Sequence, residues 1–349
     1  MIKSIAVISG GVAIAVVVLT VIFLQSEQSP AEQSKETLAI IPLDQIVSGG
    51  PPRDGIPSID NPKFVSPRGA ELQDSELVLG LEIEGDVRAY PLRILVWHEI
   101  VNDVVGGEPV AMTYCPLCFT NQVFKRTIEG NEVEFGTSGK LYNSNLVMYD
   151  RASETLWSQA LGQAIVGEHA GKTLERIPFD IAYWKDWKAL YHDSKVLSQD
   201  TGFDRPYGAD PYDDYYASPD ILFPVSNHDA RLGSKEIVVG LENGGTFRAY
   251  RLEQIEDEIV VNDVINGRSV ALISLYPYMV RVYDRIVDGE ILKFQYENGR
   301  LVDQTGGAWN FDGEAIDGEM KGTKLTRLPF DEGYWFEWTA FHAETELYS

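Results

Sequence analysis

The residues best suited to chemistry are the two cysteines of the chain, Cys115 and Cys118, which form a Cys-x-x-Cys pair. Three kinds of chemistry use such a pair. In disulfide exchange, Pro116 and a following helix would lower the pKa of a thiol and expose its sulfur. In a metal site, two thiolates leave a tetrahedral zinc ion two ligands short. In an exported protein, a lone pair of cysteines is also expected to form a structural disulfide. These three alternatives stay open here.

A histidine would have to supply the third ligand of a metal site, and His98 is the candidate because it belongs to the same repeated unit. Two soft sulfurs and one imidazole suit copper(I) or zinc. Cys115 lies eight residues after Gly107, and His98 lies eight residues before Gly106. The two residues would therefore face each other across a hairpin. The competing interpretation is a buried, hydrogen-bonded histidine that binds no metal.

Further polar residues near these motifs could bind a ligand. Glu99 follows His98 and could reach a shared site from a helical turn. A glycine-broken segment after residue 135 could present hydroxyls and amides to a ligand, although a plain turn is the favoured interpretation. An Asp-Arg pair follows it. The candidate ligand-binding residues are Glu99, Ser138, Tyr142, Asn143, Asn145, Asp150 and Arg151.

The elements that must position these residues belong to an internal duplication. The segment 78–81 recurs as 238–241, and Val101-Asn-Asp103 recurs as Val261-Asn-Asp263, both 160 residues later. Repeats of this length indicate two copies of one structural unit. Near the ends of the copies the offset is 151, so the second copy is about nine residues shorter.

The candidate site is confined to the first copy. At an offset of 160, the second copy has Tyr278 in place of Cys118, and it has neither a cysteine nor a histidine in place of Cys115 and His98. Residues shared by both copies serve the shared scaffold, whereas residues of one copy mark a special role. We therefore expect these three residues to form one site.

The chain divides into six parts on this basis. They are a membrane anchor (1–25), a flexible tether (26–37), an irregular lead-in (38–75), a first unit (76–198), a connection (199–235) and a second unit (236–349).

Within the units, apolar residues recur mostly at every second position, which predicts strands. In the first unit we expect hairpins over 76–90, 100–114 and 123–135 and short helices over 92–99 and 183–191. The predicted fold is mainly β with short helices, as two homologous β-barrel- or sandwich-like units.

The N-terminal segment predicts the location of the protein. Residues 5–24 carry no charge, and twenty helical residues span about 30 Å, the thickness of a bilayer core. Lys3 precedes this stretch, which favours a cytoplasmic N-terminus and an exported body. The rival interpretation is a cleaved signal peptide, which would have a shorter apolar stretch and an Ala-x-Ala site. We therefore expect a single-pass protein of the cell membrane.

The charge of the chain excludes one class of partner. Its 29 Lys and Arg residues stand against 53 Asp and Glu residues, a net charge of −24. A chain this acidic, with no basic stripe, repels phosphate backbones, so we expect no nucleic-acid partner.

Four motifs together resemble a prokaryotic family catalogued as domain of unknown function 3179. They are Trp97-His-Glu-Ile-Val-Asn-Asp103, Tyr114-Cys-Pro-Leu-Cys118, Leu141-Tyr-Asn-Ser-Asn-Leu146 and Asp150-Arg151. The resemblance covers about residues 40–349 and implies no activity. The family commonly has glycine after the second cysteine, where this chain has Phe119.

Overall fold

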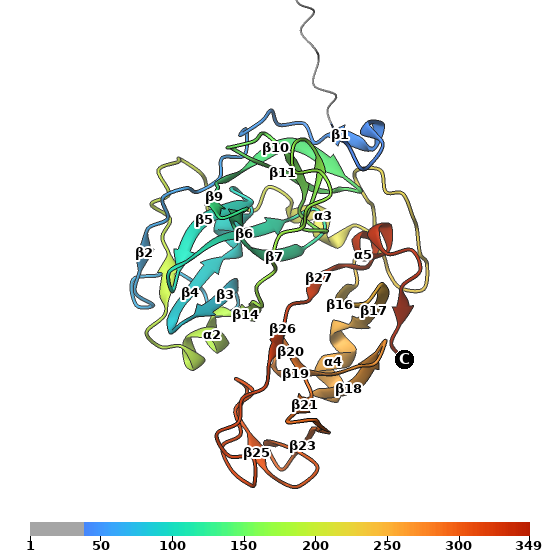
Figure 1. Cartoon of the computed structure of the whole chain (residues 1–349). Helices are drawn as coiled ribbons and strands as arrows, with labels where there is room; N and C mark the ends of the chain where they lie inside the picture. The colour runs from blue at the N-terminus through green and yellow to red at the C-terminus, as the bar shows by residue number, and fades with distance from the viewer. Residues whose placement is uncertain (1–37) are drawn as a thin grey trace, which may run out of the picture. The chain divides into compact units, whose positions relative to one another are not determined.

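Short strands in antiparallel hairpins are the commonest elements of the described chain, because apolar and polar residues alternate and glycine-containing turns interrupt them. The computed structural model describes residues 38–349 (Figure 1). The predicted anchor, 1–25, and tether, 26–37, lie outside the described residues. Of the helices that are described, none is long and apolar enough to cross a membrane.

The elements of the lead-in, the first unit and the connection are mostly short strands with a few short helices. In chain order they are η1 (Leu43–Gln45), β1 (Ile46–Ser48), β2 (Phe64–Val65), β3 (Leu77–Ile83), β4 (Asp86–Pro91), α1 (Leu92–Leu95), β5 (Ile100–Val105), β6 (Glu108–Cys115), β7 (Thr120–Lys125), β8 (Thr127–Ile128), β9 (Asn131–Glu132), β10 (Phe135–Tyr142), β11 (Asn145–Asp150), β12 (Leu156–Ser158), β13 (Gln163–Val166), β14 (Asp180–Tyr183), α2 (Trp184–Leu190), β15 (Lys195–Leu197) and α3 (Asp213–Ala217).

The second unit repeats this order in part. Its elements are β16 (Ile237–Asn243), β17 (Thr246–Arg251), α4 (Leu252–Glu258), β18 (Val260–Ile265), β19 (Arg268–Tyr276), β20 (Met279–Asp284), β21 (Ile286–Val287), β22 (Glu290–Ile291), β23 (Gln295–Glu297), β24 (Arg300–Val302), β25 (Ala308–Trp309), β26 (Arg327–Leu328), β27 (Asp331–Tyr334), α5 (Trp335–Phe341) and β28 (Glu346–Leu347).

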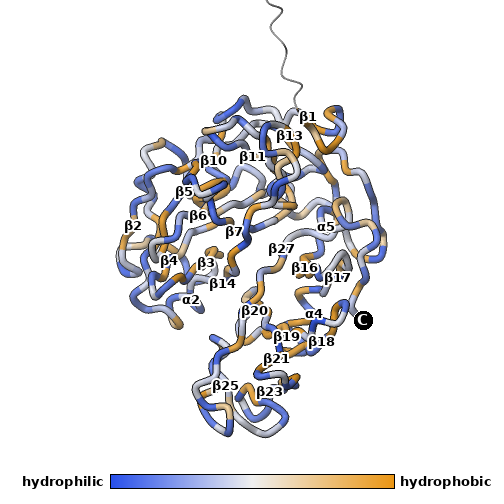
Figure 2. Tube along the Cα trace, in the orientation of Figure 1, coloured by the Kyte–Doolittle hydropathy of each residue, from blue (hydrophilic) through white to orange (hydrophobic). Residues whose placement is uncertain are grey.

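These strands form four larger sheets and three small ones, and none of the sheets in residues 38–349 closes into a barrel. The prediction of a mainly β fold is confirmed, and the arrangement resembles a sandwich. Figure 2 shows hydrophobic segments along many strands and hydrophilic segments in many of the intervening loops. This distribution follows from burying one or both faces of each sheet.

The strand pairings of the first unit recur in the second. Gly80 of β3 pairs with Asp180 of β14, and Gly240 of β16 pairs with Asp331 of β27. Each glycine lies against the ring of a tryptophan from the following helix, and an added Cβ would stand within 2.1 Å of that ring in the first unit and 2.3 Å in the second. The repeated glycine therefore reflects a close helix–sheet contact.

Reciprocal ion pairs join the two units. Arg176 of the first unit contacts Asp331 of the second at 2.6 Å, and Arg327 of the second contacts Asp180 of the first, also at 2.6 Å. The two units also share a seven-stranded sheet, β28-β17-β16-β27-β7-β6-β5. The described residues therefore form one joined structure in which each unit completes the ion pairs of the other.

Two predicted elements of the first unit differ from the structure. The helix expected over 92–99 ends at Leu95, because Glu99 has a φ of 57° and the chain turns before β5 begins. The third hairpin, expected over 123–135, is reduced to the two-residue strands β8 and β9. Residues 120–125 instead extend the sheet beside β6.

Candidate functional site

The two cysteines lie at the turn between β6 and β7, where Cys115 pairs with Thr120. Their sulfurs are 2.9 Å apart, both cysteines are free, and their exposed fractions are 1% and 0%. Phe119 closes the turn with a φ of 55°. Glycine adopts this left-handed conformation at little cost, which explains the glycine common at this position in the family that the sequence resembles.

Polar side chains of two neighbouring strands hold the second sulfur. Asn145 of β11 donates one amide hydrogen to Cys118 Sγ at 3.3 Å and another to Gln159 Oε1 at 2.8 Å. Gln159 in turn donates to Thr113 Oγ1 of β6 at 3.0 Å. The carbonyl oxygen of Ser144 lies 3.7 Å from the same sulfur. This chain of hydrogen bonds fixes the Cys118 side chain from the β10–β11 turn.

Burial controls the electrostatics of the pair. It raises the pKa of the Cys118 thiol well above its ordinary value, and the adjacent Cys115 and the charge of Glu337 raise it further. Burial also raises the pKa of Glu337, from α5, to about 8, and that of Glu99 to about 8. Two buried carboxyl groups and the buried Cys118 thiol therefore share this region, and these three groups favour their neutral forms at pH 7.

Two segments outside the repeated units cover the cysteine turn. From the connection, Tyr215 of α3 donates its hydroxyl to the Leu117 carbonyl at 2.7 Å. Beside it, Glu99, Leu117 and Tyr212 line a cavity of about 40 Å³, which Pro51 and Ile56 of the lead-in also line. We call these two segments, 49–57 and 207–215, the cover.

His98 holds the cover instead of facing the cysteines. Its Nδ1 lies 2.7 Å from the Pro57 carbonyl oxygen, and its Nε2 lies 2.6 Å from the Tyr207 hydroxyl. Because a carbonyl only accepts, Nδ1 carries the hydrogen and Nε2 accepts from Tyr207. The β5–β6 pairing starts at Ile100 and Thr113, so the ladder that was expected to align His98 with a cysteine does not extend to it.

The predicted copper or zinc site would take its third ligand from His98, but both ring nitrogens of His98 form hydrogen bonds, one with Pro57 and one with Tyr207. The structure therefore supplies only the two sulfurs of this predicted ligand set. In residues 38–349 no group of three or more His, Cys, Asp or Glu side chains is arranged to hold a metal ion. The expected disulfide is also not formed, since both thiols are free.

The alignment of Cys118 with Tyr278 is also corrected by the strand pairings. The offset between the units is 160 for β6 and β19 but 159 for β7 and β20. The first turn is therefore one residue longer, and Phe119 corresponds to Tyr278, which has a similar φ of 65°. Cys118 lies in this longer turn, so the second cysteine belongs to the part of the turn that the second unit does not match residue for residue.

Three other candidate residues stabilise the β10–β11 hairpin and its contacts. Ser138 donates its hydroxyl to the Val147 carbonyl across the hairpin. Asn143 accepts from the backbone amide of Ser226 at 2.9 Å and so attaches the connection to the turn. Tyr142 packs edge-on against Phe341, with ring centroids 5.3 Å apart. These contacts leave Ser138, Tyr142 and Asn143 in structural roles.

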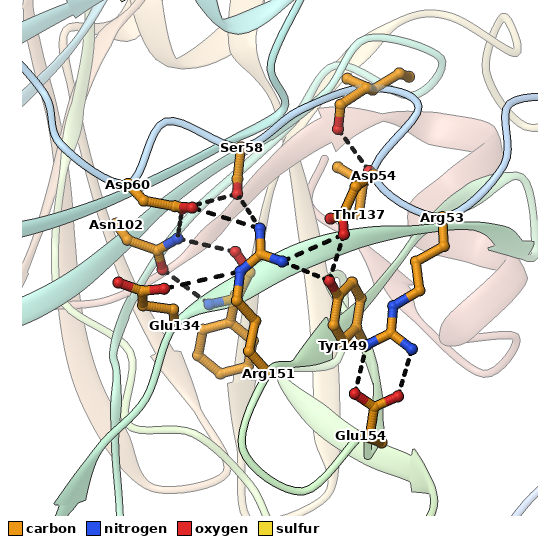
Figure 3. A network of polar contacts seen from close by, with 12 residues as sticks. Arg53, Asp54, Ser58, Asp60, Asn102, Glu134, Thr137, Tyr149, Arg151 and Glu154 are labelled. Carbon is orange, nitrogen blue, oxygen red and sulfur yellow. Dashed lines mark hydrogen bonds and ion pairs between the residues drawn. The ribbon is translucent and has the colours of Figure 1, made fainter. Parts of the chain in front are cut away.

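Arg151, directly after the end of β11, attaches the lead-in to this strand, whereas Asp150 forms hydrogen bonds within the first unit. The Arg151 guanidinium contacts Asp54 at 3.2 Å and donates to Ser58 Oγ at 2.9 Å, as Figure 3 shows. Asp150 is buried and accepts from the Trp157 indole at 3.0 Å. Of the seven candidate ligand-binding residues, Asn145 thus contacts a sulfur and Glu99 lines the adjacent cavity.

Several residues of the site were not predicted from the sequence. They are Thr113, Thr120, Tyr212, Tyr215, Gln159 and Glu337. Thr113 had a usable signal, because it is the one polar residue in the apolar run 110–114, and Thr120 had another, because it begins three consecutive polar residues directly after the cysteine turn. Glu337 had another, since it lies between Trp335 and Trp338 on a helix whose tryptophans recur in both units.

Comparison with known proteins identifies a family but no activity. The model of a family described as protein of unknown function (DUF3179) matches residues 53–345. No curated protein and no solved structure matches the chain.

Proposed function

We propose that this chain, which belongs to the DUF3179 family of proteins of unknown function, is a membrane-anchored thiol–disulfide redox protein that acts outside the cytoplasm. The observation that carries the proposal is the placement of two free sulfurs 2.9 Å apart in one turn. A disulfide joins sulfurs about 2.0 Å apart, so closing the bond requires a shift of about 1 Å within the turn.

The proposed reaction is a two-electron exchange with a disulfide, R–S–S–R, of a partner molecule. The thiolate of one cysteine attacks this disulfide, forms a mixed disulfide and releases one R–S⁻. The sulfur of the other cysteine then attacks the first, closes the internal disulfide and releases the second R–S⁻. Each cysteine loses one proton, each released thiolate gains one, and two electrons pass to the partner's disulfide.

A purely structural disulfide is the weaker explanation of the pair. In the chain-entropy model, closing a loop of four residues stabilises a protein by about 2 kcal/mol, against about 3 kcal/mol for a loop of 15 residues. The turn is also already held by the β6–β7 ladder and by the Tyr334 amide, which donates to the Cys118 carbonyl at 2.8 Å. A bond that adds little constraint is better suited to reversible opening.

A zinc or copper site fits the donor groups less well. Two thiolates on tetrahedral zinc stand about 3.8 Å apart, from zinc–sulfur bonds of about 2.3 Å. Apart from Cys115, a side chain that forms a hydrogen bond with the Cys118 sulfur is that of Asn145, whose amide donates to it. In residues 38–349 no third His, Cys, Asp or Glu side chain completes a metal-binding group with the two sulfurs.

The duplication and the anchor complete the proposal. The recurring pairings and reciprocal ion pairs support two homologous units, of which the second supplies the scaffold for the cysteine turn. The uncharged stretch 5–24 supports a location at the membrane, with the units on the oxidising side. The cover would then have to move for a partner to reach the sulfurs.

Redox titration of the full-length chain in detergent tests the function. The protein is equilibrated in mixtures of reduced and oxidised dithiothreitol, and its free thiols are counted by alkylation and mass. We expect both thiols to disappear together as one two-electron couple. In a separate incubation with oxidised glutathione, the Cys118→Ser variant should accumulate a stable mixed disulfide between Cys115 and glutathione, because no second sulfur can release the glutathione.

Two outcomes would overturn the redox function. A pair that stays closed under strong reductant would make the disulfide structural. A pair that stays reduced while copper or zinc is found at one ion per chain would make it a metal site. Metal analysis of the same preparation distinguishes these outcomes.

A further inference from the structure

Three groups of the cysteine site converge on Gly333 of β27. A Cβ added there would stand 2.9 Å from Thr120 Oγ1, 3.2 Å from the Cys118 carbonyl oxygen and 3.3 Å from Glu337 Oε2. Only glycine leaves room for this approach. The Thr120 hydroxyl thus lies between the second cysteine and a buried carboxyl group.

The contacts of Thr120 reach both neighbours. Its hydroxyl lies 3.4 Å from the Cys118 carbonyl oxygen, and its side chain forms hydrogen bonds that lower the pKa of the Cys118 thiol and of the Glu337 carboxyl. A hydroxyl accepts one hydrogen and donates another. It can therefore pass a proton from a thiol on one side to a carboxylate on the other.

The second unit lacks this arrangement. The strand pairings give the equivalent residue in the other unit for two members of the arrangement. Thr120 of the first unit is equivalent to Met279 of the second, and Gly333 of the second is equivalent to Ala182 of the first. Asp186 of α2 corresponds to Glu337 and is partly exposed. The threonine, the glycine and the fully enclosed carboxyl therefore occur together only beside the cysteine turn.

Glu337 is enclosed by few charges. Its exposed fraction is 4%. Asp331 of β27 raises the pKa of its carboxyl and Arg176 lowers it, and these two side chains contact each other at 2.6 Å. His342, at the end of α5, is buried with its pKa lowered to about 3, and stays neutral. The Cys118 thiol is a further titratable neighbour, and the charge of Glu337 raises its pKa.

We propose that Glu337 accepts the proton of the Cys118 thiol through the Thr120 hydroxyl when the pair is oxidised. This inference rests on the proposed redox function. Once Cys115 holds a mixed disulfide with R–S, the Cys118 proton passes to Thr120 while the hydroxyl proton passes to the carboxylate. The Cys118 sulfur attacks the Cys115 sulfur, the R–S⁻ leaves and takes a proton from water, and Glu337 later releases its proton.

The test is the pH dependence of ring closure. The mixed disulfide of the full-length chain with glutathione is formed at low pH, transferred to pH 6–9 and quenched with acid, and closure is followed by mass. In the native chain the rate should rise about 30-fold from pH 6.5 to 9, as the Glu337 carboxyl ionises with a pKa of about 8. In Glu337→Gln the rate at pH 9 should fall at least tenfold.

Matched variants separate a relay from a packing effect. Thr120→Ser keeps the hydroxyl and should retain the native profile, whereas Thr120→Val should behave like Glu337→Gln. Asp186→Asn, the matching change in the first unit's helix, should leave the profile unchanged. If Glu337→Gln does not fold, the comparison of Thr120→Ser with Thr120→Val tests the relay without it.

The outcomes distinguish the two proposals. A native chain that never closes its mixed disulfide refutes the redox function itself. A native chain that closes normally while Glu337→Gln or Thr120→Val keeps the native rate and pH profile refutes the relay alone.

Discussion

Replacing Glu99 by Gln should make the protein more stable, by an amount that grows as the pH rises above about 4.5. Glu99 is 7% exposed, and burial raises the pKa of its carboxyl from 4.5 to about 8. The folded state therefore binds a proton that the unfolded state has lost between pH 4.5 and 8. Since stability falls with pH wherever the folded state binds more protons, Glu99 costs stability across this window.

The magnitude follows from the same pKa. Each pH unit between the two pKa values changes the free energy of unfolding by about 1.4 kcal/mol, so the whole window amounts to about 5 kcal/mol. Glutamine has nearly the same shape and stays neutral. Glu99→Gln should thus equal the native chain near pH 4 and exceed it by up to about 5 kcal/mol above pH 8.

Denaturant unfolding of the full-length chain, followed by tryptophan fluorescence from pH 4 to 9, measures this difference. Glu253→Gln, a change at an exposed position of α4, is the control and should track the native chain at every pH. A difference between Glu99→Gln and the native chain that does not change with pH would refute the reasoning. It would mean that the carboxyl reaches water in the folded protein.

Three further predictions concern packing, the cover and the junction of the units. Gly333→Ala should lower the free energy of unfolding by about 1–3 kcal/mol, because its Cβ would press on the Thr120 hydroxyl; Gly208→Ala, which meets nothing within 4 Å, should not. His98→Ala removes both hydrogen bonds to the cover and should speed alkylation of the thiols at least tenfold, as mass measurements at intervals would show. Arg281→Met removes one of the two cations that pair with buried Asp180, Arg281 at 2.8 Å and Arg327 at 2.6 Å, and should cost about 1.5–3 kcal/mol in a thermal or denaturant unfolding measurement.

Local sequence signals predicted the parts of the fold that depend on neighbouring residues. The hairpins around Gly85 and around Gly106-Gly107 follow from alternation and from turn residues, and both form as expected. The pairing of Gly80 with Asp180 depends on distant residues, but the repeat revealed that both positions recur. Duplication therefore carried long-range information that a single copy would not contain.

The position of His98 could not be predicted by counting residues from a turn. That count assumes an unbroken ladder, but the ladder ends at Ile100, two residues short of His98, because Glu99 has a positive φ. The true partners of His98 are Pro57 and Tyr207, which lie 41 residues before it and 109 residues after it. Contacts of this kind depend on how two irregular segments fold over the unit. Such segments have no periodic pattern of apolar residues from which the contacts could be predicted.

The comparison of the two units nevertheless explains why His98 and the cysteines are absent together from the second. Glu99 and Ile259 occupy equivalent positions with φ values of 57° and 64°, so the strained turn belongs to the shared scaffold and not to the chemistry. Beside Ile259, where no cover lies, Pro277 and Tyr296 line a cavity of about 200 Å³. Beside Glu99 the cover leaves about 40 Å³. The scaffold alone thus produces an open hollow at this turn, and the lead-in and connection close it only where sulfur is present. His98 is needed only where there is a cover to hold, which links it to the cysteines without placing it against them.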